Sequence, residues 1–229
     1  MSKVFIVGLP RTGTTSLCKA CIDLGFSTAH TAYTVETIVN AEVVADTPVF
    51  NDYMLLHRKY PDARFIYLER PLAVWLPSIS RLLSRMADNL FSEHGGFNDT
   101  IKRCFFNTFQ GLTTDKIDDF EFLETCYQQH RRQALHYFQQ NKTNYICLDI
   151  ADADCHDLLC QFLNVPLQHR RMPRLNVNGK VTAWNDLKHP LKVSSTRRGK
   201  TAKDSELLAF IQDATWNSVE NTKQTMTTD

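Results

Sequence analysis

Short apolar runs and longer amphipathic segments alternate along much of the chain. A short apolar run bounded by charged residues, glycine or proline is typical of a buried strand, whereas apolar residues that recur every three or four positions indicate a helix. This pattern predicts strands over residues 3–8, 27–30, 64–68 and 144–148. It predicts helices over residues 14–24, 34–44, 49–60, 72–88, 154–163 and 206–219, of which the second is weakly patterned.

Strands that alternate with helices favour an α/β fold with a parallel sheet flanked by helices, because parallel strands need crossover connections. The pattern changes between residues 97 and 140, where the chain is helical with no strand candidate. A chain of 229 residues suits one domain with a sizeable core. We therefore expect a single domain over residues 1–229, with a helical insert at about 90–140 and a basic loop plus helix at about 190–221.

Composition narrows the class of protein further. The formal net charge of +1 gives no overall excess that would favour nucleic acid or an anionic membrane surface. The chain has seven cysteines, an odd number, and the pairs at 18/21 and 155/160 lack the four-ligand spacing of a zinc site. Free thiols at apolar positions and a reducing, cytoplasmic compartment are expected. We find no secretory leader and no apolar run of 18 residues, so we expect no membrane span.

Residues 4–17 combine an apolar run, a glycine-bracketed loop and the start of a helix. Gly8 and Gly13 have the spacing of a P-loop, in which backbone N–H groups cradle phosphates at a helix N-terminus. Thr14 stands where an ATP- or GTP-binding P-loop carries its lysine, and the positive charge lies inside the loop at Arg11. The sequence thus predicts an anion cradle without the lysine that acts on a transferred phosphate. A tight turn with no ligand is the alternative interpretation.

The segment Pro10-Arg11-Thr12-Gly13-Thr14-Thr15 resembles the 5′-phosphosulfate loop of the sulfotransferases that use 3′-phosphoadenosine-5′-phosphosulfate (PAPS). The resemblance implies a P-loop NTPase-like sulfotransferase fold and transfer of a sulfuryl group from PAPS to a hydroxyl or amine, without a metal, leaving 3′-phosphoadenosine-5′-phosphate (PAP). It also implies that all six residues bind the cofactor and that Arg11 neutralises charge during the transfer. The chain departs from the family at Ser16, where cytosolic sulfotransferases place an aromatic residue against adenine.

A second motif follows the strand predicted over residues 64–68. Arg70 ends this strand, and Ser78 lies eight residues later on the next helix. In sulfotransferases an arginine and a serine at this spacing hold the 3′-phosphate, and the guanidinium fork suits a phosphate. An ion pair between Arg70 and a surface carboxylate is the alternative interpretation. Pro77 is expected to kink the helix just before Ser78.

The resemblance extends to other parts of the chain. Three further stretches look like the small bacterial-type sulfotransferases, namely residues 60–66, 144–163 and 173–176. Near the C-terminus, Arg197, Arg198 and Gly199 are similar to the basic loop that reaches over the 3′-phosphate in this family. Gly199 would allow the backbone to approach the ligand closely. A solvated basic loop is the alternative interpretation.

The resemblance also implies a base for the acceptor. In the family a His, Glu or Asp between the two motifs takes the proton of the acceptor. Asp46 lies at about the corresponding offset before Arg70 and is the first candidate, with Asp52 and His57 as alternatives. Asp46 as a simple cap of the following helix is the other interpretation.

Two other classes of protein remain open. A P-loop nucleotide kinase or NTPase would need a lysine at Thr14 and a Mg²⁺-binding aspartate at a strand end. A catalytically silent nucleotide-binding module is compatible with the missing aromatic at Ser16. Among small-molecule, lipid and carbohydrate acceptors, the Phe- and Tyr-rich insert favours a lipid, a phenol or another apolar alcohol.

Overall fold

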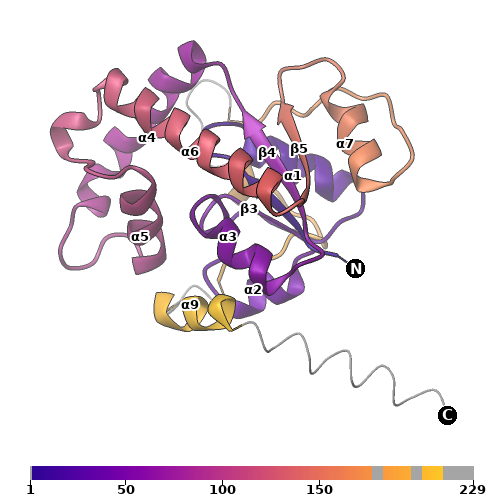
Figure 1. Ribbon diagram of the computed structural model, residues 1–229, viewed down its shortest axis with the longest axis horizontal. Coiled ribbons are helices and arrows are strands. Elements are labelled where there is room, and N and C mark those ends of the chain that lie inside the picture. Colours follow the sequence, from indigo (N-terminus) through magenta and orange to yellow (C-terminus); the bar gives the residue numbers. More distant parts are fainter. Residues whose placement is uncertain (1, 177–182, 197–202, 214–229) are drawn as a thin grey trace.

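The fold is built on a five-stranded parallel sheet in the order β2-β3-β1-β4-β5 (Figure 1). The structure, a computed structural model, describes residues 2–176, 183–196 and 203–213. The strands are β1 Val4–Val7, β2 Thr28–Ala29, β3 Val43–Ala45, β4 Arg64–Glu69 and β5 Asn144–Asp149. The predicted α/β class with a parallel sheet is therefore confirmed, and β1 lies at the centre of the sheet.

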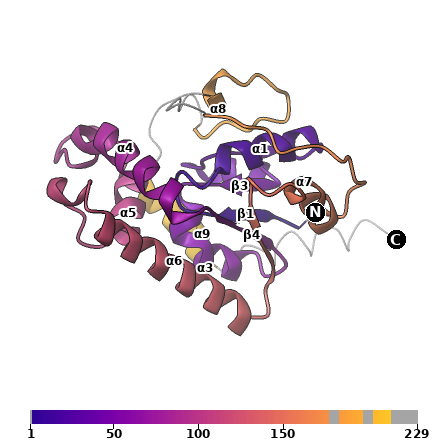
Figure 2. The same cartoon turned by 90° about the horizontal axis from the view of Figure 1, so that it is seen from above.

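Helices cover both faces of the sheet and extend beyond one side of it (Figure 2). The helices are α1 Thr14–Asp23, α2 Val35–Asn40, α3 Val49–Lys59, α4 Leu72–Leu90, α5 Asp99–Thr108, α6 Phe120–Gln140, α7 Cys155–Leu163, α8 Ala183–Asp186 and α9 Asp204–Gln212, with a 3-10 turn at Thr114–Lys116. Residues of α3, α6 and α9 pack in one core cluster, and residues of α1 and α7 pack in another. The sheet is therefore the middle of three layers.

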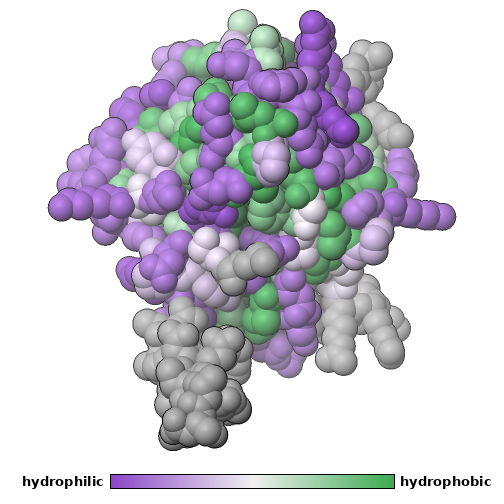
Figure 3. Space-filling view, turned by 90° about the vertical axis from the view of Figure 1, so that its right-hand side faces the viewer, coloured by the Kyte–Doolittle hydropathy of each residue, from purple (hydrophilic) through white to green (hydrophobic). Residues whose placement is uncertain are grey.

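The apolar runs of the strands are continuous because both faces of the sheet are buried. Successive side chains of a strand point to opposite faces. Phe5 and Val7 belong to the cluster under α3 and α6, whereas Val4 and Ile6 belong to the cluster under α1 and α7. This second core is incompletely covered near β5, where Ile146 is only partly buried. Figure 3 looks onto this side of the molecule and shows apolar side chains at the surface among hydrophilic ones.

The sequence pattern missed one strand. It predicted a weak helix over residues 34–44, but the helix ends at Asn40 and the chain continues into β3. A strand of three residues is too short for periodicity to identify it. It forms because β3 pairs with β1 on one side and with β2 on the other. This pairing places Asp46 at the same edge of the sheet as Gly8, which follows β1.

The predicted helical insert contains α5, the 3-10 turn and α6. These helices share a third core with α4, around Trp75, Phe105 and Phe109. All seven cysteines are free thiols and six of them are buried. Within the described parts of the chain, no helix is both long and apolar enough to cross a membrane.

Candidate functional site

Four loops meet at the carboxyl edge of the sheet. His30 follows β2, Asp46 follows β3, Gly8 follows β1 and Arg70 follows β4. Parallel sheets bind ligands at this edge, in the crevice outside the strand ends. The topology therefore brings together the predicted loop, Asp46 and Arg70, and with them a residue that the sequence did not predict, His30.

The loop after β1 is held in an unusual backbone conformation. Arg11 and Gly13 have φ angles of 75° and 112°, in the left-handed region. Thr12 closes the loop, since its N–H and its Oγ1 donate to the carbonyl of Leu9 at 3.2 and 2.8 Å. A Cβ at Gly13 would come within 2.4 Å of Ile150. Glycine is thus favoured there by its φ angle, and any other residue would also have to displace the side chain of Ile150.

The N-terminus of α1 opens from this loop without an acidic residue of its own. Gly13, the N-cap residue, has no side chain that could cap the helix, and the first turn of α1 contains no acidic residue. The first N–H groups of a helix lack intrahelical partners, and the helix dipole favours an anion beside them. The loop therefore presents backbone donors and the positive end of a helix dipole, which are the groups that an anion binds.

Arg70 and Ser78 contact the loop directly. Arg70 Nη1 donates to the carbonyl oxygen of Arg11 at 2.6 Å, and Arg11 Nε donates to Ser78 Oγ at 2.9 Å. The helix α4 continues through Pro77, and Ser78 is buried with 4% exposure. Trp75 Nε1 donates to the carbonyl of Pro10 at 3.0 Å. The two predicted motifs are thus one connected site.

Positive charge accumulates in this site. The pKa of Arg11 is lowered, first by burial and then by the charges of Arg85, Arg70 and Arg81, while Asp46 raises it. The pKa of Arg70 is also lowered by burial and by Arg81, and raised by Asp149.

Arginines that depress one another's pKa favour a bound polyanion, because its charge relieves their repulsion. These residues therefore fit a ligand with several phosphate or sulfate groups.

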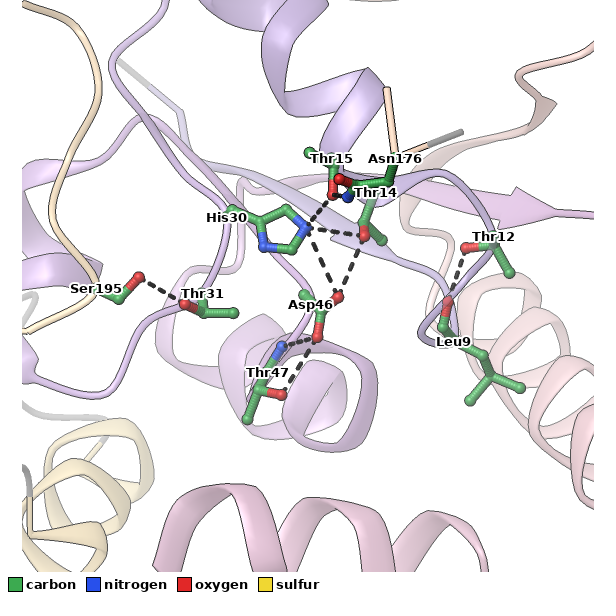
Figure 4. Close-up of polar contacts among 10 residues, drawn as sticks. All are labelled: Leu9, Thr12, Thr14, Thr15, His30, Thr31, Asp46, Thr47, Asn176 and Ser195. Atoms are coloured by element: carbon green, nitrogen blue, oxygen red, sulfur yellow. Dashed lines mark hydrogen bonds and ion pairs between the residues drawn. The ribbon is translucent and has the colours of Figure 1, made fainter. Parts of the chain in front are cut away.

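A network of hydroxyl groups, an imidazole and a carboxylate lies beside the cradle (Figure 4). Thr14 Oγ1 lies 3.1 Å from His30 Nε2 and 3.2 Å from Asp46 Oδ2. Thr15 Oγ1 lies 3.0 Å from the same nitrogen of His30. The imidazole and the carboxylate are 3.8 Å apart. The hydroxyl of Thr14 therefore connects the anion cradle to both groups that can accept a proton.

His30 is the functional candidate that sequence reasoning missed. Its side chain is 16% exposed, and burial lowers its pKa, against a smaller opposing effect of Asp46. The neutral imidazole that results can accept a proton or a hydrogen bond. The one available signal was its position at the end of the strand predicted over residues 27–30.

Asp46 is held by its neighbours rather than acting as a helix cap. Its Oδ1 accepts from the N–H of Thr47 at 2.9 Å, and its φ angle is 52°. The N-cap residue of α3 is Pro48, whose side chain makes no cap hydrogen bond. Its Oδ2 faces Thr14 and His30. The carboxylate is thus directed into the site.

The two alternative bases have other partners. Asp52 accepts two hydrogen bonds of 2.8 Å from Arg103, which also donates to Asp204 at 2.7 Å. His57 Nδ1 lies 3.0 Å from the hydroxyl of Tyr137. Of the three bases that the sequence proposed, Asp46, Asp52 and His57, only Asp46 has a hydrogen bond to the loop among the contacts of the described residues.

Ser16 has a structural partner of its own. It is 2% exposed and accepts from the N–H of Leu175 at 3.2 Å. The next residue, Asn176, donates from Nδ2 to Thr15 Oγ1 at 3.1 Å. The segment 173–176 therefore lies against the start of α1. The predicted basic residues Arg197, Arg198 and Gly199 lie outside the described residues.

A cavity of about 310 Å³ lies between α3, α5 and α6. Its walls carry five carboxamides, namely Asn51, Asn107, Gln110, Gln129 and Gln133, the aromatic side chains of Phe50, Tyr53, Phe122 and His130, and the cation Lys116. The N–H of Phe50 donates to the carbonyl of Asp46 at 3.1 Å, so one wall is a helical turn away from the site. In the described part of the chain, no group of His, Cys, Asp or Glu side chains is arranged to hold a metal ion.

Comparison with known families identifies the chain. A family model described as a sulfotransferase domain matches residues 3–41 and 32–181. Because the match spans well over half of the chain, the protein belongs to the sulfotransferase domain family. It is an enzyme that transfers a sulfuryl group to a small-molecule acceptor. A search of curated proteins gave no significant match.

Proposed function

We propose that the sulfuryl donor is PAPS. The observation that carries this proposal is the loop after β1, where Thr14 replaces the P-loop lysine and Arg11 supplies the positive charge. We assign the 5′-phosphosulfate to the loop from Pro10 to Thr15 and to the N–H groups of α1. The 3′-phosphate is assigned to Arg70 and Ser78.

We further assign Arg197, Arg198 and Gly199 to the 3′-phosphate, on the sequence resemblance alone.

The chemistry asks the protein for positioning and charge stabilisation. As the acceptor oxygen or nitrogen bonds to sulfur, the bond from sulfur to the phosphate oxygen breaks. The negative charge left on that oxygen is stabilised by Arg11 and the N–H groups of α1. The proton of the acceptor goes to Asp46, whose Oδ2 faces the cradle.

His30 is a second candidate for the base. Its Nε2 lies 3.0 Å from Thr15 and 3.1 Å from Thr14, and burial favours its neutral form. In this arrangement Asp46 would stabilise the imidazolium that forms, because the two groups are 3.8 Å apart. The variants Asp46→Asn and His30→Gln distinguish the two candidate bases.

For the acceptor, we propose the cavity between α3, α5 and α6. Carboxamides both donate and accept hydrogen bonds, and aromatic faces pack against the C–H groups of sugar rings. This lining favours a carbohydrate over the lipid or phenol that composition alone suggested, and Lys116, which also lines the cavity, suits an acidic group on the sugar. An acceptor library should accordingly contain neutral and acidic saccharides beside phenols and aliphatic alcohols.

We predict that the protein binds PAP at micromolar concentrations in the presence of EDTA, and ATP much more weakly. The reason is that the cradle neutralises its ligand with arginine rather than with lysine and Mg²⁺. Calorimetry with each nucleotide, with and without Mg²⁺, measures this. P-loop NTPases hold their Mg²⁺ with an aspartate beside the hydroxyl of the loop, and Asp46 lies beside Thr14 in the same way. Tight ATP binding that requires Mg²⁺ would therefore contradict PAPS as the donor.

Replacing Arg70 by alanine is predicted to weaken PAP binding by about 2–3 kcal/mol, as expected for a lost charge-assisted hydrogen bond. Binding of adenosine 5′-phosphosulfate, which lacks the 3′-phosphate, should weaken much less. Calorimetry on both nucleotides gives the comparison, and Arg132→Ala on the exposed face of α6 is the matched control. Because Arg70 also holds the carbonyl of Arg11, equal losses for both nucleotides would mean that it only supports the loop.

A further inference from the structure

Two arginines continue the cofactor site along α4. Ser78, Arg81 and Arg85 follow one another at intervals of three and four residues. Residues at these intervals share one face of a helix, and a span of seven residues falls only about 20° short of two full turns. Ser78 contacts Arg11, so this face of α4 is the one that borders the cradle.

The direction of helical side chains brings both guanidinium groups back toward the cradle. Long side chains on a helix lean toward its N-terminus and cover the preceding turn. This tendency favours positions of both guanidinium groups on the Ser78 side of their own turns. Both residues are exposed. Among the described residues, Arg81 makes no hydrogen bond or ion pair.

The charges of the site support the same arrangement. Arg81 and Arg85 both lower the pKa of Arg11, and Arg81 also lowers that of Arg70. Asp46 is the acid that opposes this effect at Arg11, and Asp149 is the one at Arg70.

Both motif residues already use part of their bonding capacity inside the protein. Arg70 Nη1 is bonded to the carbonyl of Arg11, and Ser78 Oγ accepts from Arg11 Nε. A phosphate monoester carries a charge of about −1.5 to −2 near pH 7 and three acceptor oxygens. Arg70 and Ser78 alone therefore leave room for further donors.

We propose that Arg81 and Arg85 extend the site of Arg70 and Ser78, and that they select a donor carrying a 3′-phosphate. This inference rests on the proposed use of PAPS. It makes the exposed face of α4 a specificity element of the enzyme, with a phosphate dianion as its ligand.

The test measures two nucleotides against three variants. PAP and adenosine 5′-monophosphate are titrated calorimetrically into the wild type, Arg81→Gln, Arg85→Gln and the double variant. Each single substitution should raise the Kd of PAP about 10-fold, as for a lost charge-assisted contact, and should change that of adenosine 5′-monophosphate little. Arg132→Gln on α6 is the matched control and should change neither constant.

Thermal unfolding separates binding from a structural role. Because Arg81 repels Arg11, Arg81→Gln without nucleotide should be as stable as the wild type or more stable. A lower Tm of Arg81→Gln without nucleotide would assign this residue a structural role and overturn the inference.

Two binding results would overturn only this inference. One is an unchanged Kd of PAP in the double variant while Arg70→Ala weakens PAP binding. This result overturns the inference also when the double variant changes the KM of an anionic acceptor. The other is an equal loss for both nucleotides, which would mean a general electrostatic effect. A wild-type protein that does not bind PAP would overturn the proposed donor and this inference together.

Discussion

Replacing Asp46 by asparagine is expected to lower kcat by about 10²- to 10⁴-fold, the usual contribution of a general base. Asparagine keeps the shape of the side chain and tolerates the left-handed backbone found at this position, where φ is 52°. It cannot take a proton from the acceptor. PAP binding should persist, because Arg11 and Thr14 are unchanged. Steady-state kinetics with an acceptor from the library, together with calorimetry of PAP, measure both effects.

His30→Gln is the companion variant that identifies the base. If Asp46 is the base, His30→Gln should retain most of kcat, since it removes only a neighbour of Thr14 and Thr15. If His30 is the base, His30→Gln should be the more damaging substitution. Near-full turnover of Asp46→Asn would show that Asp46 is not the base. Loss of activity in Asp52→Asn or His57→Ala, despite their contacts elsewhere, would move the base to α3.

The pH dependence gives an independent distinction between the two candidates. A histidine acts as a base only when it is neutral, so its activity is present above its pKa and is lost as the pH falls through that value. Burial lowers the pKa of His30 below its ordinary value of 6.5. With His30 as the base, the wild type should therefore lose activity only below about pH 6.5, and His30→Gln should remove this part of the profile.

The parts of the site that the sequence predicted are those with a local signature. The loop around Arg11 lies within a short contiguous segment, and Arg70 and Ser78 lie eight residues apart on a strand and the following helix. Such motifs are visible because their spacing is set by the local geometry of the chain. The same holds for the α/β class, which follows from the alternation of strand and helix patterns.

The parts that the sequence did not predict depend on contacts between distant residues. The strand β3 is stabilised by pairing with β1 and β2, which no window of its own residues reveals. His30 joins the site through the hydroxyls of Thr14 and Thr15, from a different loop. The ion pair of Asp52 with Arg103 could not be predicted either, because the two residues lie 51 positions apart in the sequence.

Replacing Arg11 by alanine is expected to lower kcat by about 10²- to 10³-fold, comparable to the loss of one group that stabilises transition-state charge. Arg11 lies in the loop after β1, where its carbonyl contacts Arg70 and its Nε contacts Ser78 of α4. Arg11→Lys is the matched control. It keeps the positive charge but not the planar fork, so it should recover part of kcat.

Single-turnover rates together with calorimetry of PAP separate catalysis by Arg11 from binding. A loss of PAP affinity with an unchanged single-turnover rate at saturating donor would mean that Arg11 only binds the nucleotide. Wild-type rates in both Arg11 variants would contradict its catalytic role. Arg11→Ala also removes one of the mutually repelling cations, since Arg70, Arg81 and Arg85 all lower the pKa of Arg11. The relief of this repulsion offsets the lost hydrogen bond to Ser78, so the variant should stay folded without nucleotide and the loss of kcat should appear in a folded protein.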